Sequence, residues 1–395
     1  MRILVLLQYY HTPDCPTAGR PHALVRSLAQ HHDVTLITTH TGRQRRIAYR
    51  FDWLPDSVSL RELRIPYQNA MGLRARAWAF ARYAIQACLE GLRPPRPDLI
   101  VASSTPLSVA ATAHGLARWH GVPWVFEVRD LWPDFPVQMG AVPSAGVQRA
   151  LYALERRLYR SAAHVVALSP DMATHVRRYV AAERVSMNPY GTDLALLRRA
   201  ASAPADRQHI GRAGQHLVLY AGALGRANAI PTLLDAARRL RPRSDIAWAF
   251  VGDGYHRRTV AAAARELPNV HLLPPQPYPR TLALFRQATL SITSFIDRPV
   301  LRTNAPSKFM DSLAAGTPVV VTNPGWTTQL VTSGGCGWYV PPEDAGALAR
   351  QVAAALDAPP AQQRAWQRNA RHVACTQFDR DRHMQQYRTL LESLV

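Results

Sequence analysis

Lys308 and Asp311 place a cation and a carboxylate three residues apart, a spacing that could serve chemistry. The surrounding pattern predicts a helix with Asn304 as its N-cap, Pro306 in its first turn and Gly316 just past its end. Both charged side chains would then share a face that packing does not need. Lys308 is the only lysine in the chain, which favours a task for a compact ammonium rather than a guanidinium. The alternative is a surface ion pair worth about 0.3–0.5 kcal/mol.

Glycine-containing turns after predicted strands are a second candidate for chemistry. Gly19 follows the first strand of the chain, and Gly222, Gly225 and Arg226 follow the first strand of the second half. Free N–H groups and the helix dipole point at an anion in such turns, so each predicts a phosphate-binding turn. A third turn, residues 251–254, has small residues that would let a ligand approach. The alternative for all three is an ordinary strand-to-helix connection.

Arg129 and Asp130 directly follow a predicted strand, at the end where parallel α/β domains carry out their chemistry. Burying these charges without a task would be costly, which indicates a catalytic or binding role. The alternative is a structural ion pair of Arg129 with Asp130 or Glu127. No cluster of metal ligands stands out among the 15 histidines, and the four cysteines lack metal-binding spacing and predict reduced thiols.

The elements that must position these residues are short, continuous apolar runs separated by helical segments, as expected for parallel strands buried on both faces. They predict two doubly wound α/β domains, with the active site in a cleft facing the carboxyl ends of both sheets. We place the domains at 1–195 and 196–377, with an interdomain hinge at 194–215 and a terminal helix at 378–395 that packs back across it. The predicted strands are 3–7, 33–38, 98–102, 123–127, 164–168, 217–222, 246–252, 270–273, 290–293 and 318–322.

The composition and charge bound the class of protein. At 395 residues and 47% apolar residues the chain is globular, and 47 basic against 27 acidic residues give a net charge of +20. Such an excess indicates an anionic partner, either nucleic acid or a membrane surface. The first apolar run is too short for a signal peptide, which predicts a cytoplasmic protein, and no run is long enough to span a membrane.

Basic and aromatic residues interleave between residues 43 and 96, and a helix is predicted at about 73–92. This mixture fits a patch on an anionic membrane surface. The alternative is an ordinary solvated face in an arginine-rich protein. The candidate acceptor and membrane residues are Arg45, Arg46, Arg74, Arg76, Trp78 and Arg82.

Taken together, the motifs resemble the retaining glycosyltransferases of family 4, which have the GT-B fold of two Rossmann-like domains, and within them a WbuB-like bacterial branch. The resemblance covers nearly the whole chain. It rests on the motifs at residues 102–106, 127–133, 220–226, 251–254, 267–270, 306–320 and 337–342.

The resemblance implies roles for matched positions. The nucleotide diphosphate sugar would lie mainly on the second domain, with Asp311 as a clamp on the ribose hydroxyls and Lys308 with Arg226 as the cations that stabilise the leaving diphosphate. No metal or other cofactor is then required. The implied donor-binding residues are Gly19, Gly222, Gly225, Arg226, Gly252, Asp253, Thr303, Asn304, Ser307, Lys308 and Asp311, and the implied catalytic residues are Arg129, Asp130, Arg226 and Lys308.

The chain departs from the family pattern at four places. Thr303 stands where the family has its first glutamate, Arg129 where a histidine is common, and Asn228 where a lysine follows the glycine turn. The usual Asn-Gly near the domain junction is replaced within residues 189–193. Because of these departures, the resemblance does not identify the donor sugar. A relative that binds its ligand without transferring a sugar is an alternative.

The expected activity is a retaining, metal-independent transfer of a hexosyl or N-acetylhexosaminyl group from a UDP-sugar. The acceptor would be a polyprenyl-diphosphate-linked saccharide of O-antigen or capsule synthesis, at the inner face of the cytoplasmic membrane. A GDP-sugar donor or a soluble natural-product acceptor is an alternative. A nucleic-acid-binding protein is another, and it predicts salt-dependent affinity for DNA or RNA without donor binding.

Overall fold

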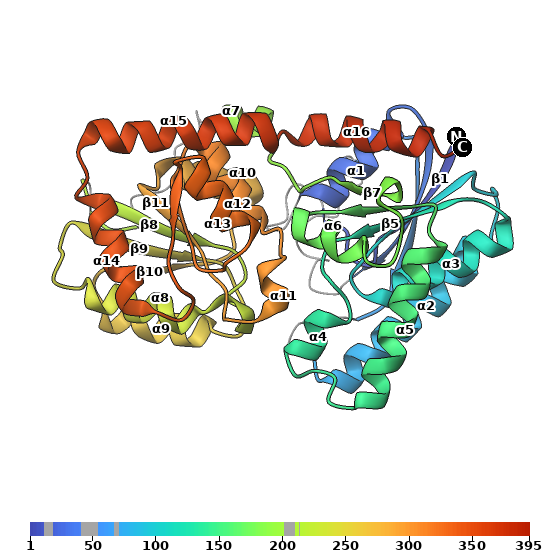
Figure 1. Cartoon of the computed structure of the whole chain (residues 1–395), viewed down its shortest axis with the longest axis horizontal. Helices are drawn as coiled ribbons and strands as arrows, with labels where there is room; N and C mark the ends of the chain where they lie inside the picture. Colours follow the sequence, from blue (N-terminus) through green and yellow to red (C-terminus); the bar gives the residue numbers. More distant parts are fainter. Residues whose placement is uncertain (12–18, 41–53, 67–70, 201–209, 213) are drawn as a thin grey trace. The chain divides into compact units, whose positions relative to one another are not determined.

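The computed structural model describes residues 1–11, 19–40, 54–66, 71–200, 210–212 and 214–395, and it contains two parallel β-sheets (Figure 1). The chain divides into two units by its contacts. Unit 1 is Met1–Pro189 with Thr303–Ala305 and Asp381–Val395, and unit 2 is Tyr190–Arg302 with Pro306–Arg380. The predicted fold, two doubly wound α/β domains, is confirmed.

Unit 1 is built on a seven-stranded sheet in the order β3-β2-β1-β4-β5-β6-β7, with every pairing parallel. Helices α1 and α16 pack on one face, and α2 and α3 contact strands from the other. The strands are β1 Arg2–Leu6, β2 Asp33–His40, β3 Val58–Arg64, β4 Leu99–Ser103, β5 Trp124–Val128, β6 His164–Ala167 and β7 Val185–Met187. The helices are α1 Arg20–Ala29, α2 Leu73–Gly91, α3 Leu107–His120, α4 Asp134–Gln138, α5 Ala145–Ser161, α6 Pro170–Val176, the 3₁₀ turn Ala182–Arg184 and α16 Arg380–Glu392.

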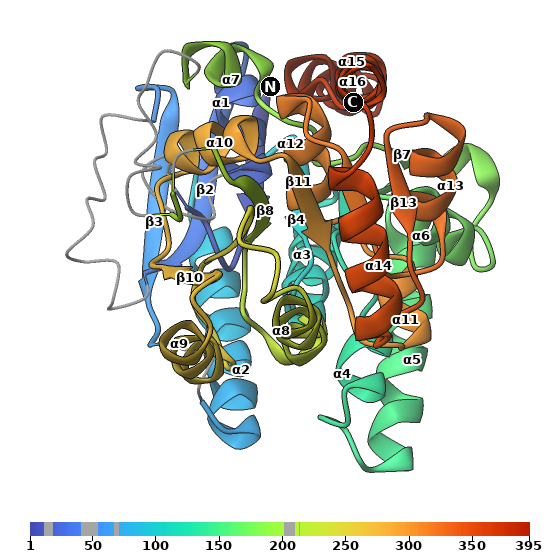
Figure 2. The same ribbon diagram turned by 90° about the vertical axis from the view of Figure 1, so that its left-hand side faces the viewer.

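Unit 2 has a six-stranded parallel sheet in the order β10-β9-β8-β11-β12-β13. Helices α8, α9 and α14 form one apolar layer, and α10 and α12 lie on the opposite face of the sheet (Figure 2). The strands are β8 His216–Ala221, β9 Ile246–Val251, β10 Val270–Leu273, β11 Leu290–Thr293, β12 Val319–Val321 and β13 Gly337–Tyr339. The helices are α7 Leu194–Ala200, the 3₁₀ turn Arg226–Asn228, α8 Ile230–Arg239, α9 Arg257–Glu266, α10 Tyr278–Gln287, α11 Pro299–Arg302, α12 Ser307–Ala315, α13 Trp326–Ser333, α14 Ala345–Leu356 and α15 Pro360–Gln377.

The segment 194–215, where we expected the interdomain hinge, begins with helix α7, and its residues 201–209 and 213 lie outside the described residues. The chain instead passes from unit 1 to unit 2 between Pro189 and Tyr190 and returns between Arg380 and Asp381. The Ala- and Arg-rich composition at the start of this stretch does not distinguish a short helix from a linker, because both residues favour helices.

The terminal helix packs back onto unit 1, as predicted, although it begins at Arg380 rather than at Phe378. Met384, Tyr387 and Leu391 are each at most 3% exposed and join the apolar core that α1 and the first sheet share. Unit 1 therefore draws part of its core from a segment that follows all of unit 2 in the chain.

Candidate functional site

Lys308 lies half-buried on α12, next to the carboxyl end of β8. Its ammonium donates a hydrogen bond of 2.7 Å to the hydroxyl of Tyr220 and sits 4.0 Å from the centre of that ring. Burial lowers the pKa of Lys308 to about 7. Among the described residues no carboxylate forms an ion pair with Lys308, so the alternative of a surface pair with Asp311 is wrong.

The ammonium of Lys308 faces Gly222. A Cβ atom at this glycine would come within 3.2 Å of Nζ, and its φ of +141° also favours glycine. The N–H group of Gly222 donates to the carbonyl of Val251, and that of Gly252 donates to Leu273. The expectation that a free N–H group at Gly222 points at phosphate is therefore wrong. The role of the two glycines is to let the ends of neighbouring strands approach closely, since a Cβ at Gly252 would lie 2.0 Å from the carbonyl oxygen of Gly222.

The two glycine turns of unit 2 clasp each other through their backbones. The N–H of Leu224 donates to the carbonyl of Asp253, and the N–H of His256 donates back to Leu224. A Cβ at Gly254 would meet the Leu224 backbone at 2.8 Å. The structure thus brings together the predicted donor-binding residues Gly222, Gly225, Arg226, Gly252 and Asp253.

Arg226 is exposed and stacks on the ring of Tyr255, with its guanidinium carbon 3.9 Å from the ring centre. The Tyr255 side chain is itself 63% exposed. An aromatic ring holds the guanidinium without neutralising its charge, so Arg226 stays able to bind an anion. The sequence singled out Arg226 but not Tyr255, because the two positions are joined only through the clasped turns.

Asp311 is buried, and the expectation that it occupies a face free of packing is wrong. Its Oδ1 accepts hydrogen bonds of 2.8 Å from the hydroxyls of Thr192 and Tyr278. Arg380 donates to the hydroxyl of Tyr278 and to the carbonyl of Gly191. Burial raises the pKa of Asp311, opposed by Arg380 and the two hydroxyl donors. This carboxylate therefore links the segments by which the chain enters and leaves unit 2.

The start of α12 differs from the prediction. The helix begins at Ser307 with Pro306 at the N-cap position, so neither Asn304 as N-cap nor Pro306 in the first turn is correct. Ser307 is exposed, and Thr303 and Asn304 group with unit 1, where the hydroxyl of Ser169 donates to the carbonyl of Thr303 at 2.6 Å. The helix ends as predicted at Gly316, whose φ is +79°.

A buried ion pair at the edge of the first sheet was not predicted. Arg20, the first residue of α1, donates from Nε to Glu127 at 2.8 Å, and the two side chains are 0% and 2% exposed. The same guanidinium donates to Asn188 and to the carbonyl of Pro189, while Ser103 donates to the other oxygen of Glu127. Glu127 is thereby paired with Arg20. Gly19 immediately precedes this arginine as the N-cap of α1.

Arg129 and Asp130 do lie together at the carboxyl end of β5. The N–H of Arg129 donates to the hydroxyl of Ser104. Burial raises the pKa of Asp130 to about 6, and the charge of Arg129 opposes this. His11 is close enough to Arg129 to be affected, and burial together with that charge lowers its pKa to about 4. The imidazole of His11, which no sequence motif singled out, therefore lies within electrostatic reach of the predicted pair.

The predicted membrane patch falls largely on α2, whose observed bounds agree with the predicted helix. Arg74 and Trp78 are exposed, Trp78 by 64%, and Arg76 and Arg82 are partly exposed. Ile85 and Leu89, both more than half exposed, continue the stripe of Trp78 and Arg82 at helical spacing. Arg45 and Arg46 lie outside the described residues.

A second basic surface, which sequence reasoning missed, lies between α3 and α5. It lines a shallow pocket of about 510 Å³ with His114, Arg118, Arg156, Arg157 and Arg160. The spacing of the last three arginines on one amphipathic helix was the available signal. In the part of the chain that the structure describes, no helix has the length and apolarity needed to cross a bilayer.

Comparison with known proteins places each half of the chain in a family. Residues 18–191 match the model of the family described as "Glycosyl transferase 4-like domain", and residues 203–373 match "Glycosyl transferases group 1". Together the matches span most of the chain.

Two curated relatives and one solved structure illustrate the similarity. The putative colanic acid biosynthesis glycosyl transferase WcaI of Escherichia coli K12 is 27% identical over 66% of this chain and 67% of its own length. The probable glycosyltransferase WbjE of Pseudomonas aeruginosa is 26% identical over 66% of both. Anabaena Alr3699/HepE in complex with UDP-glucose shares the fold, with a TM-score of 0.72, 20% identity and full coverage of both chains.

Proposed function

The chain belongs to the family 4 glycosyltransferases, and from that premise we propose that it transfers a sugar, with retention of configuration, from a UDP-sugar to a lipid-linked saccharide. The relative named for colanic acid biosynthesis supports a role in cell-surface polysaccharide synthesis. The resemblance to HepE, whose structure holds UDP-glucose, supports UDP as the donor base.

The observation that carries the proposal is the placement of Lys308. A lone, half-buried ammonium with a pKa near neutrality faces an exposed glycine at the end of β8. No carboxylate among the described residues neutralises it, so a diphosphate would supply the missing negative charge. Arg226, presented by the neighbouring turn, would bind the same anion.

In the proposed transfer, the charges of the site assist departure of the diphosphate. Lys308 and Arg226 would stabilise the negative charge that develops on the leaving diphosphate, and no metal is needed for that step. A leaving phosphate oxygen would take the proton of the acceptor hydroxyl as the new bond forms on the same face. Arg129 and Asp130 would position the acceptor. The remaining donor contacts are proposed for Gly19, Gly222, Gly225, Gly252, Asp253, Thr303, Asn304, Ser307 and Asp311.

The lipid-linked acceptor would be reached from the membrane surface. The exposed stripe of Trp78, Ile85 and Leu89 beside Arg74 and Arg82 has the apolar and cationic groups that an anionic bilayer surface binds. We propose peripheral association at the cytoplasmic face. Flotation with anionic vesicles tests this association. The triple variant Arg74→Glu, Trp78→Ala and Arg82→Glu should remain unbound in the dense fraction. The control Arg265→Glu on unit 2 should float with the vesicles as wild type does.

The donor proposal is tested by thermal-shift titration of the full chain with UDP, GDP, ADP and TDP, with and without EDTA. A ligand that binds only the native state stabilises it by mass action. Stabilisation by UDP alone, unchanged by EDTA and weakened in Lys308→Met, is expected. Selective stabilisation by GDP would show that the donor carries guanosine instead of uridine. Stabilisation by none, together with salt-dependent binding of DNA or RNA, would overturn the assignment.

A further inference from the structure

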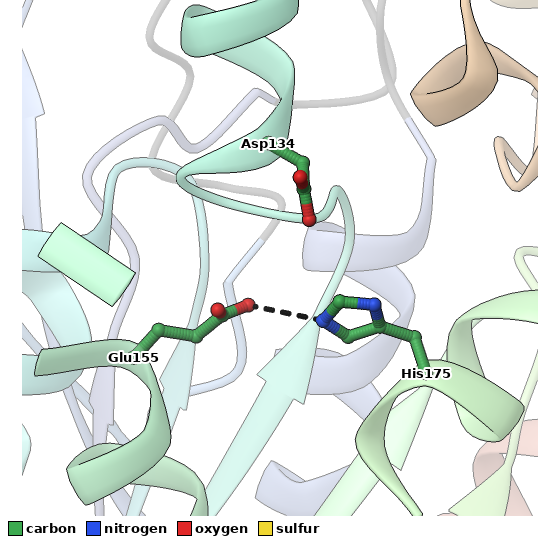
Figure 3. Close-up of side chains that lie close together, drawn as sticks. All are labelled: Asp134, Glu155 and His175. Carbon is green, nitrogen blue, oxygen red and sulfur yellow. Dashed lines mark ion pairs between the residues drawn. The ribbon is translucent and has the colours of Figure 1, made fainter. Parts of the chain in front are cut away.

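Three metal-ligating side chains to which no role is assigned above converge in unit 1 (Figure 3). Asp134 begins α4, Glu155 lies on α5 and His175 lies on α6, and one ligand atom of each lies within 4.8 Å of the others. The figure shows the Asp134 carboxylate pointing toward the space beside the Glu155 and His175 pair. The absence of any metal-ligand cluster inferred from the sequence is thus corrected, because 20 or more residues separate these positions.

The cluster holds acceptor atoms that the protein leaves unsatisfied. The Glu155 side chain is 0% exposed, and within the described structure its Oε2 has no hydrogen-bond partner. The Nε2 atom of His175 is also buried without a hydrogen bond, although it lies 3.4 Å from Oε1 of Glu155. A fully buried carboxylate without a strong cationic partner is costly, so something further should balance its charge.

The outer contacts of the cluster hold its carboxylates in place. The hydroxyl of Tyr152 donates to Oδ1 of Asp134 at 2.9 Å, and that of Tyr159 donates to Oε1 of Glu155 at 3.0 Å. Hydroxyl donors behind carboxylate ligands are what orients the ligands of a metal site. Neither hydroxyl carries a positive charge, so these two donors orient the acids without offsetting their charge.

We propose that Asp134, Glu155 and His175 bind a divalent zinc ion. One imidazole and two carboxylates suit zinc, and two ligands about 2.0–2.2 Å from a tetrahedral ion lie roughly 3.4 Å apart. The separation of 3.4 Å between Nε2 of His175 and Oε1 of Glu155 agrees with that geometry. The ion would lie between two atoms that form no hydrogen bond with each other.

The site would have a structural consequence rather than a part in sugar transfer. Helix α4 starts four positions after Asp130, and it would be cross-linked by the ion to α5 and α6. Zinc would therefore fix the segment that leaves the carboxyl end of β5. The proposal does not depend on the donor site, and it holds whichever sugar nucleotide the protein uses.

Chelator-treated, untagged full-length protein dialysed against zinc, with metal analysis of the protein, tests the proposal. We expect about one zinc per chain, raised thermal stability on zinc addition, and visible d–d absorption of a low-coordinate ion when cobalt replaces zinc. Glu155→Gln and His175→Gln should weaken binding by at least about tenfold and remove the cobalt bands.

Matched substitutions at exposed positions provide the control. Glu183→Gln and His372→Gln change the same residue types on the surface and should bind zinc as wild type does. Zinc bound equally by Glu155→Gln, His175→Gln and the controls would show adventitious surface binding and overturn the proposal. So would a chelator-treated wild type that binds no zinc. Asp134→Asn, on the shortest helix of the three, serves if a variant at Glu155 or His175 fails to fold.

Discussion

Arg20 and Glu127, 107 residues apart in the chain, form an ion pair in which neither side chain is more than 2% exposed. The pair joins the start of α1 to β5, and Nη1 of Arg20 donates to Asn188 and to the carbonyl of Pro189. The guanidinium also lies 5.4 Å from the ring centre of Tyr387 on α16. A single side chain of α1 thus contacts the sheet, the segment at Asn188 and Pro189, and the terminal helix.

Removing one member of this pair should strongly destabilise unit 1. Arg20→Met leaves the carboxylate of Glu127 buried and unpaired, a change that costs about 3–5 kcal/mol. The double variant Arg20→Met and Glu127→Leu should recover much of that loss. Urea unfolding measures both, and Arg2→Met, which breaks the exposed pair with Asp98, is the control with an expected loss of about 0–1 kcal/mol. A loss below that of the control would contradict the account.

Donor binding should be coupled to proton uptake through Lys308. With a pKa of about 7, the Lys308 side chain is mostly a neutral amine at pH 8 in the free protein. A bound diphosphate favours the charged form and raises that pKa, so the complex takes up a proton at this pH. Calorimetry of UDP binding in buffers of different ionisation enthalpy measures the uptake. Lys308→Arg, always charged, should bind without uptake; equal uptake in that variant would assign the proton elsewhere.

The buried carboxylate of Asp311 should be needed for folding as well as for any contact with the donor. Asp311→Ala leaves the hydroxyls of Thr192 and Tyr278 without their acceptor, at a cost of about 1–3 kcal/mol. Asp311→Asn keeps an acceptor oxygen and should unfold near wild-type urea concentrations. If the ribose contact exists, Asp311→Asn still binds UDP more weakly. Equal stability of the Ala and wild-type proteins would contradict the structural role.

Asp130 should make the protein less stable as pH rises. Its folded-state pKa of about 6 exceeds the ordinary value of 3.8, so the folded state binds its proton more tightly than the unfolded state does. Stability from this group is present below pH 3.8 and is lost as pH rises toward 6. Thermal melting of Asp130→Asn should therefore equal wild type near pH 3.5 and exceed it at pH 8. Asp56→Asn, an exposed matched change, should show no such difference.

The strands that form the centres of both sheets were predictable because their apolar runs are continuous, as in β4, where all five residues are buried. Strands β3, β7 and β13 were not predicted, and all three lie at sheet edges. β3 contains four polar or charged residues among its seven, and β7 and β13 have three residues each. Edge strands bury fewer side chains, so their sequences carry a weaker signal.

The candidate site was predictable where function depends on local sequence, and not where it depends on tertiary contact. The glycine turns follow recognisable strands and Lys308 lies on a recognisable helix, so their positions could be inferred. Burial of Asp311 could not, because its partners Thr192 and Tyr278 come from distant segments. The partnership of Glu127 with Arg20 could not be predicted for the same reason, because the two residues are 107 positions apart in the chain.

The contribution of α16 to the core of unit 1 bears on how the protein is made. Tyr387 and Leu391 cover the same apolar surface as Leu24 and Leu28 of α1. The two α16 residues are synthesised only after unit 2. Until then, the apolar surface of the nascent first unit that they cover stays exposed. Exposed apolar surface of this kind is prone to aggregation during synthesis. Production of the protein should therefore depend on chaperone capacity, and residues 1–189 expressed alone should be poorly recovered.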